Sequence, residues 1–444
     1  MTTEISKTQL LDLHRGFFRR ARHLLRWTDQ IHKRVEKLRP PKDLKGATFL
    51  FDFAHFFLTR SRNTLREISD TLEKLEVSLN QNQPSLKSIS DQMWLLWRYK
   101  FDQVESNNHA IERHFHPVLA VRSKSDEAYD RFILKFLVEI GLPTIHPISV
   151  HKLIKQSSAA AVERFTLHDK LKLPPHQPKL GSNLEQKYGN VVFAIFYFFP
   201  SVRSLTSLTL LYHEVGHVFW EYVATRAERE RLLMKMHQAF IPSCHDHLEK
   251  EIAADAFAAL VGGYSFYATF CPFLLTKPEG WSSRTSGYLP PDQRMWITRH
   301  GTTLTRVSEN DLGDSFFRAW DSLERLFRSQ NNPKPLTRIT MNGNKAIEFL
   351  KEFKEVLERH SVKLADKPRE PNYNENGCPV LPSSKSDLRI RELFTTATYF
   401  RDKVDSAEEY IAWEERALAL AGLRPPMKPP VHPGCGSGPP PRSG

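Results

Sequence analysis

The chain has little cysteine, and its opening stretch lacks a secretory signal. Its 444 residues include four cysteines, no two of which form a CxxC pair: Cys244, Cys271, Cys378 and Cys435. This spacing excludes a disulfide framework and a thiolate zinc knuckle, and it favours a reducing compartment. The first residues, MTTEISKTQL, lack the basic and apolar regions of a signal peptide. We therefore expect a cytoplasmic protein.

Long apolar runs are also scarce. The longest uncharged run, residues 256–276, reads AFAALVGGYSFYATFCPFLLT. It is nearly long enough to cross a bilayer, but two glycines, a proline and several hydroxyl groups dilute it. The composition therefore favours a buried pair of helices over a transmembrane segment.

Basic residues outnumber acidic ones, 63 to 51, which gives a formal charge of +12. Part of the excess lies in residues 1–45, with twelve Lys and Arg against five Asp and Glu. Such an excess favours contact with acidic partners, among them nucleic acid and anionic lipid. A solvated basic helix face is the simpler interpretation, so nucleic-acid binding receives only weak support.

Hydrophobic periodicity divides the chain into four regions. Apolar residues recur at helical spacing over most of the first region, and the proline-rich end cannot bury enough surface to fold. The predicted regions are a helical bundle or hairpin (1–145), a mixed core (146–305), a helical C-terminal region (306–423) and a disordered Pro/Gly-rich tail (424–444).

One strand stands out among the expected elements. The run NVVFAIFYFF, residues 190–199, is rich in β-branched and aromatic side chains, although a buried helix segment would have the same pattern. After the strand, helical periodicity returns in several stretches: from about 204, then 248–260, 311–328, 345–359 and 388–420.

The stretch LLYHEVGHVFW, residues 210–220, carries the first group of residues suited to chemistry. On a helix, His213 and His217 point to one side and can bind one zinc ion at about 2.0–2.1 Å each. Glu214 would lie near the metal without being a ligand, and could accept a proton from a water held there. Gly216 keeps the helix slim where a substrate or another backbone approaches.

A second group follows in EKEIAADAFAAL, residues 249–260. Glu251 and Asp255 stand four apart and so share a helix face. One carboxylate could bind zinc while the other accepts a hydrogen bond from a ligand histidine. Small side chains would let this helix lie close to the histidine helix: Ala253, Ala254 and Ala256.

HExxH followed by ExxAD on the next helix resembles the gluzincin clan of zinc metallopeptidases, in particular compact members related to CAAX-prenyl and heat-shock membrane peptidases. The resemblance covers about residues 188–299. It implies a mainly α fold in which a zincin-like α+β core with a short sheet is flanked by helical domains. It also implies that the strand at 190–199 is the edge strand along which a substrate lies extended.

The resemblance also implies roles for individual residues. His213, His217 and Glu251 would be the zinc ligands. Glu214 would be the general base, and Asp255 would hold a ligand histidine. The chain departs from a segment that relatives often carry, His-Pro-Pro followed by arginine, because YLPPDQRMW has leucine in place of the histidine. The group that stabilises the oxyanion therefore stays open among four candidates: Tyr264, Tyr288, Arg294 and His300.

Other interpretations of these residues remain. The two histidines of HEVGH could be ordinary interior side chains, and Glu249 stands two residues from Glu251 as an alternative ligand. The segment CHDHLEKE offers a rival metal cluster, although adjacent ligands rarely complete a tetrahedron: Cys244, His245, Asp246 and His247.

The sequence thus predicts a zinc metalloendopeptidase that needs Zn²⁺ and acts on a protein or peptide substrate. The N-terminal helices would be available to a protein partner. The alternative is a non-catalytic zinc-binding scaffold whose basic N-terminal helices bind a partner or nucleic acid.

Overall fold

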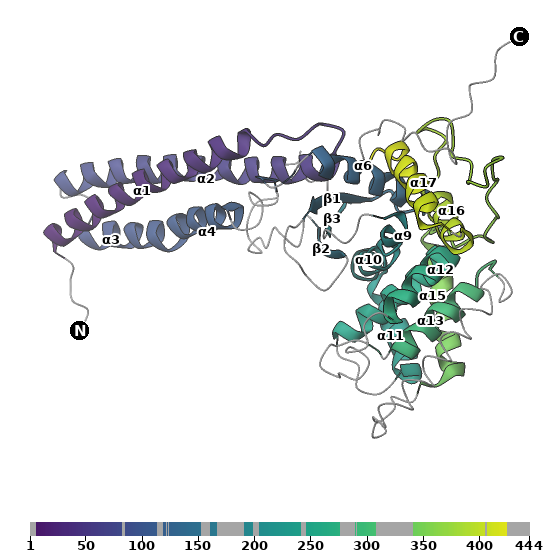
Figure 1. Cartoon of the computed structure of the whole chain (residues 1–444). Coiled ribbons are helices and arrows are strands. Elements are labelled where there is room, and N and C mark those ends of the chain that lie inside the picture. The colour runs from purple at the N-terminus through teal and green to yellow at the C-terminus, as the bar shows by residue number, and fades with distance from the viewer. Residues whose placement is uncertain are drawn as a thin grey trace, which may run out of the picture. The chain divides into compact units, whose positions relative to one another are not determined.

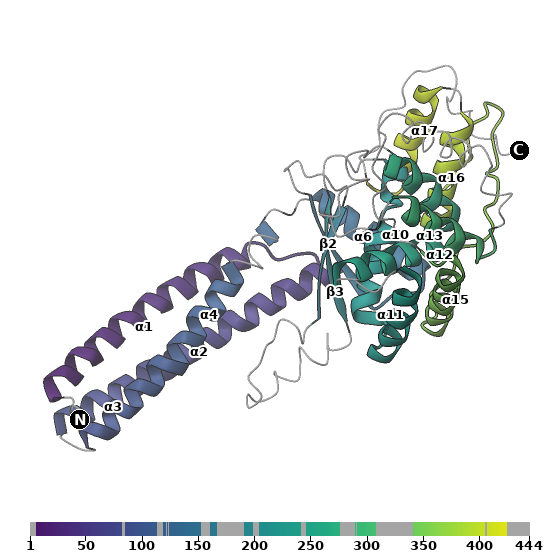
Figure 2. The same cartoon turned by 90° about the horizontal axis from the view of Figure 1, so that it is seen from below.

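The computed structural model describes most of the chain and is mainly helical, with one small sheet (Figure 1, Figure 2). The chain divides into two compact units, one up to residue 123 and one that holds every described element from Lys124 onward. The described residues are 6–81, 85–112, 119–120, 122, 124–151, 160–166, 191–198, 204–240, 246–275, 289, 291–307, 341–404 and 406–423.

The first unit is built from long helices that pack side by side (Figure 1, Figure 2). Apolar residues recur at three- and four-residue spacing, so each helix buries one stripe against the others. A capping box formed by Ser6 and Gln9 begins the first helix. The elements are α1 (Lys7–Glu36), α2 (Lys45–Gln81), α3 (Leu86–Leu95), the π-helical η1 (Leu96–Phe101) and α4 (Asp102–Ala110).

The second unit begins earlier than the predicted core. Its first helix, α6 (Lys124–Glu139), packs against the sheet, although the sequence placed this segment in the N-terminal helical domain. Buried Phe132 and Phe136 explain the difference, because both rings pack against Phe394 of the second unit.

Within the described residues the sheet has three strands in the order β1-β3-β2, with bounds β1 (Ile145–His151), β2 (Ala160–Thr166) and β3 (Val192–Phe198). β3 lies within the predicted strand, so that prediction is confirmed and the helical alternative is wrong. The expectation of an edge strand is also wrong, because β3 pairs in parallel with β1 and antiparallel with β2. An unbroken apolar run is typical of a strand covered on both faces, and Phe193, Ala194 and Phe196 are fully buried.

The rest of the described second unit, from residue 204 onward, is mainly helical. α15 confirms the helix predicted at 345–359, whereas the stretch 388–420 forms two helices, α16 and α17. The predicted helix at 311–328 and the tail from 424 lie outside the described residues. The bounds are α9 (Leu205–Leu208), α10 (Leu211–Val218), the π-helical η3 (Phe219–Val223), α11 (Arg226–Phe240), α12 (Asp246–Leu275), α13 (Pro291–Thr303), α15 (Gly343–Arg359), α16 (Ile390–Lys403) and α17 (Ala407–Leu420).

α12 contains the apolar run 256–275 and is kinked at Gly263, whose φ of 54° and ψ of −131° are not helical. A Cβ atom there would lie 2.5 Å from the Cβ of Ala365, so glycine permits both the backbone angle and the close contact. The run is therefore a buried, kinked pair of helical segments, as predicted. No described helix is long and apolar enough to cross a membrane.

Two cysteines can be placed. Cys271 is free and buried on α12, whereas Cys378 is disulfide-bonded. The sequence favoured a reducing compartment, in which thiols stay free. Cys271 agrees with this expectation, and Cys378 does not. A cytoplasmic location stays a prediction.

Candidate metal centre

The helix that carries HEVGH lies directly against α12. At Gly216 of α10, a Cβ atom would stand 2.8 Å from the Cα of Ala254 and 2.9 Å from its carbonyl oxygen. Real Cβ atoms do not approach a backbone so closely, so the contact requires glycine. Ala253, Ala254 and Ala256 are fully buried, as expected for small residues at a close helix contact.

This approach brings the three expected ligands His213, His217 and Glu251 together. Nε2 of His213 lies 3.2 Å from Oε2 of Glu251, and Nε2 of His217 lies 3.3 Å from Oε1 of the same carboxylate. One ligand atom from each residue falls within 4.8 Å of the others. His217 and Glu251 are 8% and 7% exposed, so the group is nearly closed to solvent.

The arrangement fits a zinc ion. Four ligands at about 2.0–2.1 Å from a tetrahedral centre stand about 3.3 Å from one another. Both distances between a histidine nitrogen and a Glu251 oxygen are close to that edge. Two imidazoles and one carboxylate leave a fourth position for water, which is the donor set of a catalytic zinc site.

Asp255 fixes the orientation of one ligand. Its Oδ1 lies 2.9 Å from Nδ1 of His213, on the opposite side of the ring from Glu251. This contact holds the Nδ1 side of the ring at Asp255 and so directs Nε2 toward the ligand group. Asp255 is only 1% exposed. Asp255 is therefore a buried contact of His213 on the side away from Glu251.

Arg294 completes the cluster from α13. Its Nε and Nη2 donate to the two oxygens of Asp255 at 2.6 and 2.8 Å, and Nη2 also lies 3.8 Å from Glu251. The guanidinium is 4.8 Å from the ring centre of Phe270. In the sequence this arginine was a candidate for binding the oxyanion, whereas in the structure it makes a two-pronged ion pair with the partner of a ligand histidine.

The charges in the cluster shift its pKa values strongly. Burial lowers the pKa of His213, but hydrogen bonds to Asp255 and Glu251 outweigh it and raise that pKa to about 10. Burial raises the pKa of Glu251, yet its contacts with the two histidines hold it well below its usual range. Burial likewise raises the pKa of Asp255, and Arg294 more than offsets this effect. Without metal, a protonated His213 therefore balances the buried carboxylates.

The other candidates for stabilising an oxyanion have partners outside the ligand group. Tyr264 of α12 stacks on Tyr399 of α16, with ring centres 4.8 Å apart. His300 of α13 stacks on Trp296 at 3.8 Å, and its Nδ1 lies 2.9 Å from the Trp296 carbonyl oxygen. Tyr288 lies outside the described residues. The geometry thus singles out none of these three as the oxyanion group.

The alternative ligand Glu249 faces another helix, because its carboxylate lies 2.8 Å from Nε2 of His237 on α11.

Glu214, the candidate general base, lies on α10, is partly buried and falls outside the described ligand group. For the rival cluster CHDH, the side chains lie outside the described part of the chain.

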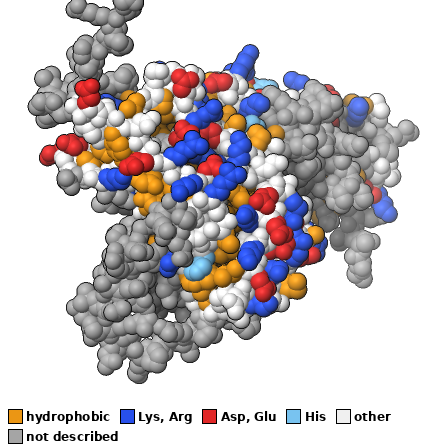
Figure 3. All heavy atoms as spheres, turned by 90° about the vertical axis from the view of Figure 1, so that its right-hand side faces the viewer, with side chains coloured by type: hydrophobic (Ala, Val, Ile, Leu, Met, Phe, Trp, Pro, Cys, Tyr) orange, Lys and Arg blue, Asp and Glu red, His pale blue; other side chains and the backbone are white. Residues whose placement is uncertain are grey.

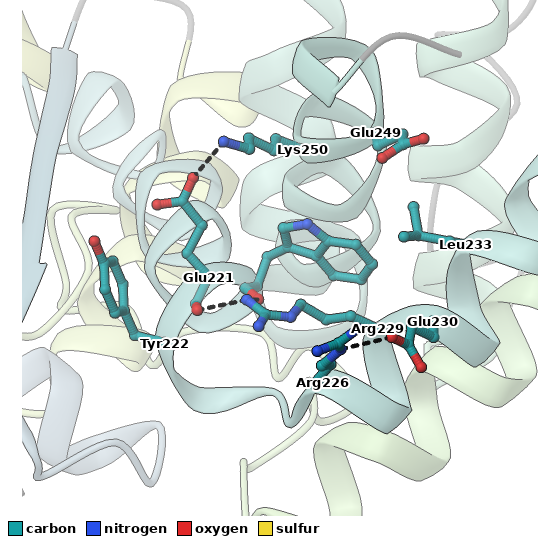
Figure 4. A pocket seen from close by; sticks show the side chains of 9 residues that line it. Glu221, Tyr222, Arg226, Arg229, Glu230, Leu233, Glu249 and Lys250 are labelled. Atoms are coloured by element: carbon teal, nitrogen blue, oxygen red, sulfur yellow. Dashed lines mark hydrogen bonds and ion pairs between the residues drawn. The ribbon is translucent and has the colours of Figure 1, made fainter. Parts of the chain in front are cut away.

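A cavity of about 500 Å³ lies where η3, α11 and the start of α12 meet (Figure 4). Figure 4 shows its charged groups in contact with one another: Lys250 lies 2.7 Å from Glu221, and Arg229 donates to the Glu221 carbonyl at 2.6 Å. None of the lining residues belongs to the ligand group: Trp220, Glu221, Tyr222, Arg226, Arg229, Glu230, Leu233, Glu249 and Lys250.

Charges of both signs are mixed on the face seen in Figure 3, so the net positive charge does not gather there into one basic patch. This distribution is typical of a solvated surface.

No protein-family model, no curated protein and no solved structure matches the chain. The resemblance to gluzincins therefore depends on the motif residues and on how the structure arranges them.

Proposed function

We propose that the chain is a zinc-dependent metallopeptidase of the gluzincin type, which hydrolyses peptide bonds in protein or peptide substrates. The observation that carries the proposal is that His213 and His217 each lie within 3.3 Å of an oxygen of Glu251, with one ligand atom from each of the three residues within 4.8 Å of the others. A zinc ion bound there would polarise the scissile carbonyl and lower the pKa of a water molecule toward neutrality.

The protein's own residues divide the remaining work. His213, His217 and Glu251 would hold the ion, and Asp255 fixes the orientation of His213. Glu214 would accept a proton from the attacking water and then deliver it to the leaving amine, as a general base and acid can. Its place on the histidine helix, outside the ligand group, supports this role.

We further propose that the second unit contains a zincin-like core in which β2 takes the part expected of the edge strand. β2 runs antiparallel to β3, lies at the end of the described sheet and packs against α10. An extended peptide can add to such an edge through main-chain hydrogen bonds. The substrate would then lie beside the helix that carries Glu214.

The test compares Glu214→Gln with wild type on a peptide library, scoring new N-termini. We expect the variant to keep its zinc and to lose about 10²–10⁴-fold in turnover, the usual contribution of a general base. Glu249→Gln is the matched control, because it changes a carboxylate that contacts His237. Turnover that persists in Glu214→Gln would contradict the mechanism, and a zinc-loaded wild type without turnover would favour the scaffold alternative.

A further inference from the structure

A second cluster of metal-binding side chains lies in the first unit. His32 and Glu36 stand one helical turn apart on α1, and His55 faces them from α2. One ligand atom from each residue falls within 4.8 Å of the others. Nothing in the proposed peptidase mechanism uses these residues.

Glu36 is the centre of the cluster. Its Oε1 lies 3.2 Å from Nε2 of His55 and 3.8 Å from Nε2 of His32. Its other oxygen accepts a hydrogen bond from Arg39 at 3.0 Å, which holds the carboxylate in place. The Nε2 atoms of His32 and His55 thus approach the same carboxylate oxygen. Their ring centres are 5.1 Å apart, with the rings tilted by 51°.

These distances are close to those of a bound ion. The edge of a zinc tetrahedron is about 3.3 Å, which the contact between His55 and Glu36 already matches. The contact to His32 must close by about half an ångström, a small change for side chains that are 17–42% exposed. The same exposure leaves room for a water ligand. A nearby cation, Arg62, is paired with Asp29 at 2.6 Å, which reduces its repulsion of an incoming ion.

We propose that His32, Glu36 and His55 form a second zinc site, which ties the C-terminal end of α1 to the start of α2. Two imidazoles and a carboxylate suit Zn²⁺ and neighbouring transition metals better than Mg²⁺ or Ca²⁺. The ion would bridge the two helices across the turn RPPKDLKG. The site is independent of the HEVGH group, because all three ligands belong to the first unit.

The experiment measures zinc per chain by elemental analysis of the full-length protein after dialysis against buffered zinc. His55→Ala should carry one zinc fewer than wild type. Its zinc affinity at this site should also weaken by at least about 100-fold, because losing a ligand costs more than losing a residue that only hydrogen-bonds to a ligand. His23→Ala is the control, because this histidine is exposed on the same helix, α1, and lies outside the described metal groups. It should keep the wild-type content.

Equal zinc in His55→Ala and His23→Ala would overturn the proposal. Glu36→Gln gives a second test with little change of shape, and it should also lose one zinc. This test of the second site is separate from the test of the peptidase hypothesis. His55→Ala changes a ligand in the first unit, whereas His217→Ala changes a ligand of the HEVGH group. A wild type with one zinc that His217→Ala loses and His55→Ala keeps would support the HEVGH site and overturn the second one.

Discussion

At the residue scale, the buried ion pair of Arg294 and Asp255 distinguishes the cluster from a simple metal-binding triad. Asp255 is 1% exposed and contacts both Arg294 and a ligand histidine. A buried carboxylate without a cation is unfavourable, so the arginine keeps Asp255 charged and in place. We regard Arg294 as a positioning residue for His213.

Replacing Arg294 with methionine should lower the free energy of unfolding by about 3–5 kcal/mol, because among the described residues His213 is then the one cation that faces the two buried carboxylates of Glu251 and Asp255. Arg294→Lys keeps the charge and loses the two-pronged geometry, so its stability should fall between those of wild type and Arg294→Met. Chemical denaturation of the metal-free protein measures both. Equal stability of wild type and Arg294→Met would contradict the importance of this pair.

Protons and zinc compete for His213. With the pKa of this histidine raised to about 10 in the metal-free state, His213 carries a proton at pH 7 that zinc must displace. Zinc affinity should therefore rise with pH from 6 to 9, roughly tenfold per unit for one displaced proton. The His55→Ala variant is used because it removes the second proposed zinc site. Calorimetry of zinc binding to it in two buffers of different ionisation enthalpy counts the released protons. Zinc binding without proton release would contradict a protonated His213 in the metal-free protein.

At the element scale, the close approach of α10 and α12 brings the ligands together. Gly216→Ala should destabilise the protein by about 1–3 kcal/mol, because the added methyl group meets the backbone of Ala254. Gly16→Ala is the control: it lies inside α1 with open space around it, and should stabilise by about 0.5–1 kcal/mol through the lost backbone freedom of glycine. An unchanged unfolding midpoint for Gly216→Ala would show that the helices can separate without cost.

Local periodicity explains what the sequence could predict. Four-residue spacing pairs His213 with His217 on α10 and Glu251 with Asp255 on α12. Joining the two pairs into one metal site followed from the resemblance to gluzincins, not from the spacing. The contact between Arg294 and Asp255 spans 39 residues and depends on how α13 packs, which no local pattern encodes.

Two other features were not predicted, for different reasons. The strand β1 was not expected from the sequence. It contains Pro147, a residue that a strand tolerates at the edge of a sheet, where β1 lies. For the cluster of His32, Glu36 and His55 the sequence does contain a signal. A helical hairpin that turns near RPPKDLKG places residues 32 and 55 at similar distances from the turn, and this pairing indicates that the two histidines can meet.

At the scale of the whole molecule, the chain consists of two compact units, and each contains an apolar core of its own. Separate cores favour separate cooperative unfolding. We expect two thermal transitions in calorimetry, with Gly16→Ala raising the midpoint of one and Gly216→Ala lowering the midpoint of the other. A single transition that both variants shift would contradict independent units.

The central claim is that HEVGH and Glu251 hold zinc, and elemental analysis of purified protein tests it most directly. His217→Ala should contain one zinc fewer per chain than wild type. His237→Ala, which changes an exposed histidine of the same unit, should contain as much as wild type. Equal zinc in all three proteins would mean that the histidines of HEVGH are packing residues, and the proposed peptidase would be wrong.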